Sequence, residues 1–143
     1  MNMSIDTIFG IAGTALNAQL TRMNATASNL ANAGTVSSTE KDAFRAKRPV
    51  FQALVDEQMT HSGAAYVGGV KVAKIADDAA PPQRVADPKN PLADKDGYVY
   101  KSNVSEVTEM VEMMAAARSY QNNVEVINTA RQLMMRTLDI TRA

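Results

Sequence analysis

The chain has 143 residues, enough for one domain or for one small domain with extended arms. Its 15 basic and 15 acidic residues cancel, so no overall charge attracts nucleic acid or anionic lipid. The absence of cysteine excludes disulfides, thiolate catalysis and Cys-ligated metal sites. The first residues lack the basic region and apolar segment of a cleaved signal peptide, and no window approaches the ~18 apolar residues of a membrane span. We expect a chain that is soluble at first, does not insert into a membrane, and leaves the cytoplasm, if it does, without a cleaved signal.

The N-terminal part, residues 1–34, is predicted to be a long helix because no proline interrupts residues 4–32. Apolar or small residues recur there in alternating steps of four and three, the heptad pattern of a coiled-coil seam. The predicted seam residues are Phe9, Gly13, Leu16, Leu20, Met23, Ala27 and Leu30. Asn32 and Gly34 are typical left-handed cap residues, so the helix is expected to end there.

The middle part, residues 35–103, is predicted to be a small insert with β-structure and no ligand pocket. Its first half contains a basic, Phe-containing loop over residues 40–51, which continues as a short helical or irregular piece to residue 59. Alternating valines over residues 70–75 predict a bent strand or strand pair, with a bulge or bend at the preceding Gly68-Gly69.

The second half of the insert is rich in proline: four of the five prolines fall within residues 77–96. This predicts a surface loop with a short extended piece at residues 83–85. Asp96-Gly97 predicts a turn that leads into a strand at residues 98–100.

The C-terminal part, residues 104–143, is predicted to be the longer helix, because neither glycine nor proline occurs from Val104 to Ile140. Ser105 resembles a helix start, with Glu106, Glu109 and Glu112 near the positive end of the helix dipole. The predicted seam, interrupted by Arg131, consists of Met110, Met113, Ala117, Tyr120, Val124, Ile127, Met134 and Leu138. A helix of roughly 55 Å needs a long partner. The fold class is therefore mainly α with a small β insert, in which the terminal helices form a coiled-coil pair; an ordinary antiparallel bundle has the same periodicity.

No pattern of catalytic or metal-binding residues accompanies these helices. If Gly97 took the sixth position of a calcium loop, Leu92 and Asn103 would occupy the first and twelfth positions, where Asp and Glu are required. His61 is the single histidine and has no second ligand type near it in sequence. We therefore predict no catalytic residue, no metal site, no cofactor and no enzyme.

One stretch has a more specific pattern, which fits a Ser-Asn-x-Ala-Asn-x-x-Thr signature. Its residues are Ser28, Asn29, Ala31, Asn32 and Thr35. With the segments 44–52, 87–100 and 117–126, this stretch resembles the bacterial flagellar basal-body rod protein family, closest to its proximal rod members. The similarity covers nearly the whole chain in order, although residues 33–38 depart from the family pattern.

The resemblance implies a structural subunit of the flagellar basal-body rod, the drive shaft that crosses the periplasm and transmits torque. It implies assembly through the terminal helices with other rod subunits and copies of itself, after export by the flagellar type III apparatus. Phe51 and Val55 match the Phe-x-x-x-apolar element that early export substrates share. The alternative is a soluble helical adaptor or export chaperone that buries its two helices against each other.

Overall fold

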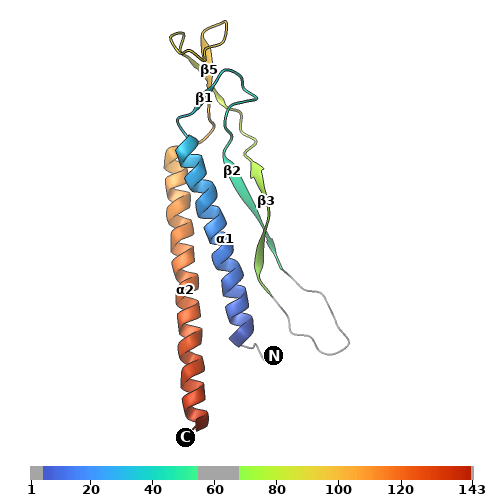
Figure 1. Ribbon diagram of the computed structural model, residues 1–143, viewed down its shortest axis with the longest axis vertical. Helices are drawn as coiled ribbons and strands as arrows, with labels where there is room; N and C mark the ends of the chain where they lie inside the picture. Colours follow the sequence, from blue (N-terminus) through green and yellow to red (C-terminus); the bar gives the residue numbers. More distant parts are fainter. Residues whose placement is uncertain (1–4, 55–67, 143) are drawn as a thin grey trace, which may run out of the picture.

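Two long antiparallel helices form the body of the molecule in the computed structural model, which describes residues 5–54 and 68–142. Helix α1 spans Ile5–Asn32 and helix α2 spans Glu106–Arg142, and the two lie side by side (Figure 1). With 28 and 37 residues, the helices measure about 42 and 55 Å at 1.5 Å per residue. The C-terminal turns of α2 therefore project past the start of α1.

The strands form two small antiparallel sheets. Strand β1 (Val36–Ser37), β5 (Tyr98–Lys101) and β4 (Gln83–Ala86) form a three-stranded sheet, in that order, beyond the end of α1. Strands β2 (Lys47–Ala53) and β3 (Val70–Asp77) form a two-stranded ribbon that runs along α1 on the side away from α2 (Figure 1).

Several predicted local structures are confirmed. Strand β5 covers residues 98–100, β4 covers the extended piece at residues 83–85, and the turn between them has Gly97 at a φ of 80°. Helix α2 starts as predicted: Ser105 Oγ accepts the Thr108 N–H at 3.4 Å, and its carbonyl accepts the Glu109 N–H at 2.9 Å.

Three local predictions are wrong. Residues 47–53, expected to be loop and irregular, form strand β2, because their backbone pairs with a strand distant in sequence. The register shift in the ribbon leaves Ala73 without a partner, so the irregularity is not at Gly68-Gly69. Helix α1 does not end in a left-handed cap, since neither Asn32 nor Gly34 has a positive φ.

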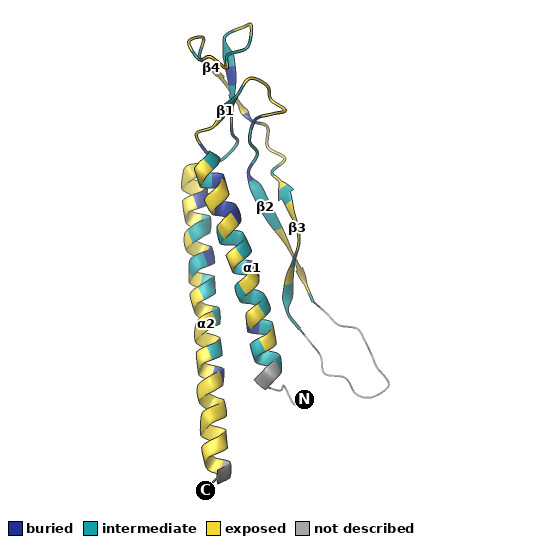
Figure 2. Ribbon diagram, viewed as in Figure 1, coloured by how far each residue is buried: buried dark blue, intermediate teal, exposed yellow. Residues whose placement is uncertain are grey.

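The core consists mainly of alanine. Apart from Val99 and Pro82, the buried apolar residues of the described chain are all alanines, and the largest fully buried side chains are Glu109, Asn29 and Ser102. Many large apolar side chains are exposed instead, above all on α2, where every residue from 131 to 140 is exposed (Figure 2). Alanine at the contact lets the helices approach closely, while many of the larger apolar side chains remain exposed.

Candidate assembly interface

Helix α1 presents three different faces. One face is formed by two series of residues spaced seven apart, all buried or half-buried, which point towards α2. They are Phe9, Leu16, Met23 and Leu30, and Ala12, Gln19 and Thr26, with the buried Ala33 continuing the second series just past the helix end. A second face, with Thr14, Ala18 and Ala25, points towards the β2–β3 ribbon. The third face is exposed and made of small or polar residues with a single leucine: Gly10, Gly13, Asn17, Leu20, Asn24, Ala27 and Ala31.

The predicted seam of α1 is thus divided between two faces. Phe9, Leu16, Met23 and Leu30 lie on the buried face, whereas Gly13, Leu20 and Ala27 lie on the exposed face. The positions that complete the buried face hold alanine, glutamine and threonine, so an apolar pattern could not reveal them. A Cβ atom added at Gly10 or Gly13 would meet nothing within 4 Å, which leaves the exposed face open to close approach.

In α2 the predicted seam is displaced in a similar way. Met113, Tyr120 and Ile127 are half-buried, and the positions that alternate with them are Glu109, Ala116, Asn123 and Ala130, buried or half-buried. Met110 and Val124 are exposed and Ala117 is half-buried, because each lies one residue past the contact position. The break expected at Arg131 is absent from the observed face, which passes through Ala130 instead.

Met134 and Leu138 continue the contact face of α2 beyond the part that α1 covers. Both share the helical phase of Ile127 and Ala130, yet they are 40% and 47% exposed. Leu133, Met135 and Ile140 are exposed around them. In this projecting segment, residues 131–140, every residue is exposed, the apolar ones included (Figure 2).

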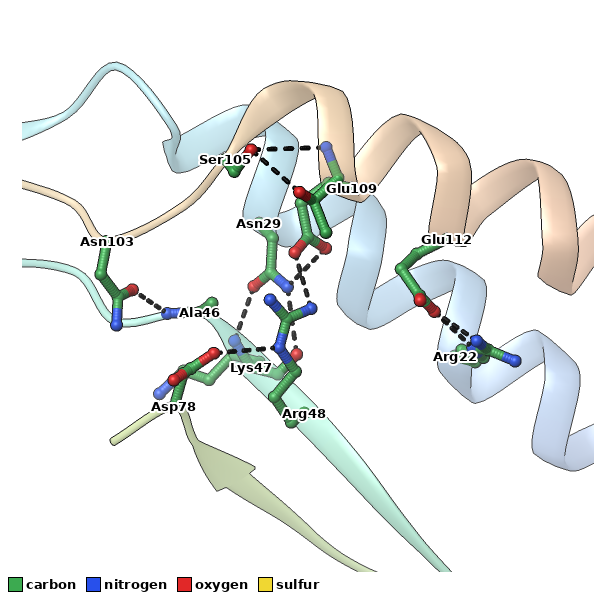
Figure 3. Close-up of polar contacts among 11 residues, drawn as sticks. Arg22, Asn29, Ala46, Lys47, Arg48, Asp78, Asn103, Ser105, Glu109 and Glu112 are labelled. Atoms are coloured by element: carbon green, nitrogen blue, oxygen red, sulfur yellow. Dashed lines mark hydrogen bonds and ion pairs between the residues drawn. The ribbon is translucent and has the colours of Figure 1, made fainter. Parts of the chain in front are cut away.

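A polar joint connects the two helices to the ribbon (Figure 3). Asn29 Nδ2 donates to Glu109 Oε2 at 2.9 Å and to the Lys47 carbonyl at 3.0 Å, and Asn29 Oδ1 accepts the Lys47 N–H at 2.7 Å. Glu109, whose side chain is 0% exposed, places Oε1 2.6 Å from Arg48 Nη1. The buried carboxylate is therefore paired with a cation and hydrogen-bonded, as burial of a charge requires.

Two further contacts extend this joint to neighbouring segments. Arg48 Nε donates to Asp78 Oδ2 at 3.3 Å, and Asn103 Oδ1 accepts the Ala46 N–H at 2.8 Å (Figure 3). Burial acts to lower the pKa of Arg48, but the carboxylates of Glu109 and Asp78 outweigh it and raise the pKa overall. The pKa of Asp78 is lowered, first by the Ala80 N–H that it accepts and then by Arg48.

The signature residues have two structural roles. Asn29 is buried in the joint, whereas Asn32 and Thr35 close the end of α1: Asn32 Nδ2 donates to the Ser28 carbonyl at 2.8 Å, and Thr35 Oγ1 donates to the Asn32 carbonyl at 2.7 Å. Ser28 and Ala31 are exposed on α1. The sequence did not reveal Glu109 as a partner of Asn29, nor Arg48 as the partner of Glu109. One signal for Glu109 was present in the sequence: it precedes Met113 by four residues and Ala116 by seven, so all three lie on one face of the helix.

The remaining candidate residues lie apart from this joint. Phe51 is 39% exposed on β2, and Val55 and His61 lie outside the described residues. Asp94, which would be the third residue of the calcium loop considered from the sequence, accepts the Asp96 and Tyr98 N–H groups at 2.9 Å each, so it serves as a turn residue. The Tyr98 hydrogen bond is also the main reason why the pKa of Asp94 is lowered.

The described part of the chain contains no group of three or more His, Cys, Asp or Glu residues that could hold a metal ion. Neither helix, over the residues described, has a stretch apolar enough to cross a membrane. Open clefts flank the β2–β3 ribbon, one beside Arg22, Pro49 and Phe51 and the other beside Ala25 and Ile75. The absence of a ligand pocket in the insert remains a prediction.

Comparison with known proteins gives consistent matches at both ends of the chain and over its length. The family model described as "Flagella basal body rod protein" matches residues 9–36, and "Flagellar basal body rod FlgEFG protein C-terminal" matches residues 95–140. The FlgC flagellar basal-body rod protein of Salmonella typhimurium is 49% identical over 138 residues, which cover 96% of this chain and 98% of that protein. FlgC of Bacillus subtilis is 35% identical over 141 residues, covering 91% and 93%. The chain therefore belongs to the FlgC family of flagellar basal-body rod proteins.

Proposed function

We propose that this protein is a structural subunit of the proximal rod of the bacterial flagellar basal body and that it has no enzymatic role. The family membership supports the rod, and one structural observation supports the mode of assembly. The observation is the projecting segment of α2, residues 131–140, whose apolar side chains continue the contact face of the helix where α1 no longer covers it. Exposed apolar surface of this kind is typical of an interface with a partner.

The proposed assembly uses the faces that each helix leaves uncovered. Helices of neighbouring rod subunits, and of further copies of this chain, pack on the small exposed face of α1 and on the projecting segment of α2. Coiled-coil pairing within the rod then involves the terminal parts, residues 1–34 and 104–143, while the insert, residues 35–103, lies outside them. In this arrangement the helices carry torque along a shaft in the periplasm.

The seam residues proposed for this role are those that retain exposed surface in the single chain. On α1 they are Gly13, Leu20 and Ala27, and on α2 they are Met110, Val124, Met134 and Leu138. The half-buried members of the seam support the pairing of α1 with α2 within one chain. They are Phe9, Leu16, Met23 and Leu30 on α1, and Met113, Ala117, Tyr120 and Ile127 on α2. A neighbour that binds the exposed members would therefore contact a helix pair already formed.

Replacing Leu138 with Asp tests this proposal. The substitution puts a charge on the apolar face of the projecting segment, and full burial of a leucine contributes about 1.5–3 kcal/mol at each subunit of the rod. We expect Leu138→Asp to abolish or strongly reduce motility and the recovery of basal bodies. Asp139→Asn, on the neighbouring position, is the matched control and should leave both unchanged.

Outcomes of this experiment separate the rod from the alternative of a soluble adaptor or export chaperone. If the purified Leu138→Asp chain unfolds, the two helices are a self-contained bundle, as the alternative expects. Equal effects of the two substitutions on basal bodies would contradict assembly through this face of α2.

We further propose that the chain reaches the periplasm through the flagellar type III export apparatus, without a cleaved signal peptide. The residues that support this step are Phe51 and Val55, which match the Phe-x-x-x-apolar element of early export substrates. Phe51 is partly exposed on β2, so its replacement should disturb recognition of the chain more than its fold.

A further inference from the structure

The β2–β3 ribbon is held on α1 by two hydrogen-bonded sites, one at each end. Near one end, Asn29 binds both backbone polar groups of Lys47, at 2.7 and 3.0 Å. Near the other end, Thr14 Oγ1 accepts the Val70 N–H at 3.2 Å. Gly69 permits this second approach, because a Cβ atom there would lie 2.8 Å from Thr14 Oγ1. The sites fix both the position of the ribbon along α1 and the face of α1 that it covers.

The first of these sites also depends on α2. Asn29 Nδ2 has two hydrogens, and it donates one to the ribbon, at Lys47, and one to α2, at Glu109 Oε2. Glu109 in turn contacts Arg48, which belongs to the ribbon. A closed set of three contacts thus connects α1, α2 and β2 through three side chains, Asn29, Glu109 and Arg48 (Figure 3).

We propose that Asn29, Glu109 and Arg48 are positioning residues that make docking of the β2–β3 ribbon conditional on the pairing of α1 with α2. Without α2, Asn29 loses the carboxylate that orients its amide, and Arg48 retains only Asp78. Without the ribbon, the carboxylate of Glu109 is left in the helix contact with no cation, which is strongly unfavourable for a buried charge. Each docking step therefore stabilises the other. The inference goes beyond the rod function and does not depend on it.

The chain provides a matched control for this proposal. Arg22 and Glu112 also form an ion pair between α1 and α2, two helical turns from Asn29 and one from Glu109 (Figure 3). Among the described residues, no hydrogen bond connects that pair to the ribbon. Loss of the Arg22–Glu112 pair should weaken helix pairing without removing a direct contact of the ribbon. Loss of the Glu109 charge should release the ribbon as well.

Amide hydrogen exchange of the full-length chain measures the two events separately. In Glu109→Gln, we expect the ladder amides of β2 and β3 and the Lys47 amide to exchange roughly tenfold faster or more, with a smaller change in the two helices. In Glu112→Gln, the ribbon should keep its protection relative to the helices. A double-mutant cycle adds a second criterion: Arg48→Met should add little to Glu109→Gln but should add fully to Glu112→Gln.

Several outcomes would overturn the inference. One is the same exchange pattern in Glu109→Gln and Glu112→Gln. Another is an unchanged exchange rate of the ribbon amides in Glu109→Gln, and a third is a ribbon whose amides are unprotected in the wild-type chain. If Glu109→Gln does not fold, the partly exposed Arg48 provides the second variant. Arg48→Met should release the ribbon and, because Glu109 is then buried without its cation, should lower the protection of the helices to a smaller extent. Equal losses of amide protection in the ribbon and in the helices of Arg48→Met would show that the joint is a general stability element and not a positioning device.

Discussion

Three consecutive alanines in α2 allow a direct test of how the helix is rotated against α1. Ala116 is 0% exposed, Ala117 is half-buried and Ala115 is exposed. Replacing each by leucine adds the same volume in the same helix with almost no change in helix propensity. At the closely packed Ala116 the extra atoms have no space, and overpacking of this kind costs about 1–3 kcal/mol. At Ala115 the leucine points into solvent, so its effect should stay within roughly 0.5 kcal/mol.

Thermal unfolding of the three purified variants, followed by circular dichroism at 222 nm, measures these differences. At this chain length 1 kcal/mol corresponds to a shift in Tm of about 2–8 °C, so Ala116→Leu should lower Tm measurably while Ala115→Leu does not. Ala117→Leu should fall between them. The apolar heptad pattern in the sequence makes Ala117 the contact position instead. A largest loss at Ala117 would refute the rotation described here, and equal losses at all three positions would show that α2 has no fixed rotation against α1.

Three further predictions concern the insert. Gly97→Ala should lower the free energy of unfolding in urea by about 1 kcal/mol or more, because φ is 80° and the new Cβ would lie 3.1 Å from Pro88 Cβ. Gly34→Ala is the control and should not lower it, since a Cβ at Gly34 meets nothing within 4 Å. Since folding lowers the pKa of Asp78, the contribution of Asp78 to stability is present above pH ~3.9 and is lost as the pH falls through the folded-state pKa. The free energy of unfolding, measured between about pH 5 and 2, should therefore depend less on pH in Asp78→Asn than in the wild-type chain. Phe51→Ala should reduce secretion into the periplasm without reducing synthesis, and unchanged secretion would remove Phe51 from the proposed export element.

The helices were predictable from the sequence, but their rotation was only half predictable. The absence of proline and glycine over residues 104–140 indicates a continuous helix in any environment. The rotation of a helix about its axis is inferred from the spacing of its apolar residues. On the contact face of α1, however, large apolar residues alternate with Ala12, Gln19 and Thr26. Leu20 was therefore assigned to the contact although its side chain is 43% exposed. A pattern of apolar residues includes every face that will be covered in the final assembly, so it does not separate contacts within the chain from those between chains.

The insert shows a different limit of sequence analysis. Strands that adjoin their own turn, such as β5 after Gly97, are encoded locally and were predicted. Strand β2 begins with Lys-Arg-Pro and pairs with a strand that starts at Val70, so its extended form depends on a distant partner. The joint is more distant still, since Asn29 and Glu109 are 80 residues apart. A buried polar network is defined by the meeting of several elements, and no single element reveals it.

The distribution of side-chain sizes has a consequence for stability. Burial contributes roughly 0.8 kcal/mol for each CH₂ group, so the alanines of the α1–α2 contact contribute little each compared with about 1.5–3 kcal/mol for a fully buried Leu, Ile or Met. Several large apolar side chains of α2 lie outside that contact, as in Met135 and Ile140, which are 55% and 77% exposed. Part of the hydrophobic free energy available to α2 is thus not used within one chain. It becomes available when a partner covers the helix, and a partner that binds the folded chain alone stabilises it in proportion to its occupancy. The folded state of this protein and its assembled state are therefore expected to be linked, with α2 reaching full stability only beside its neighbours.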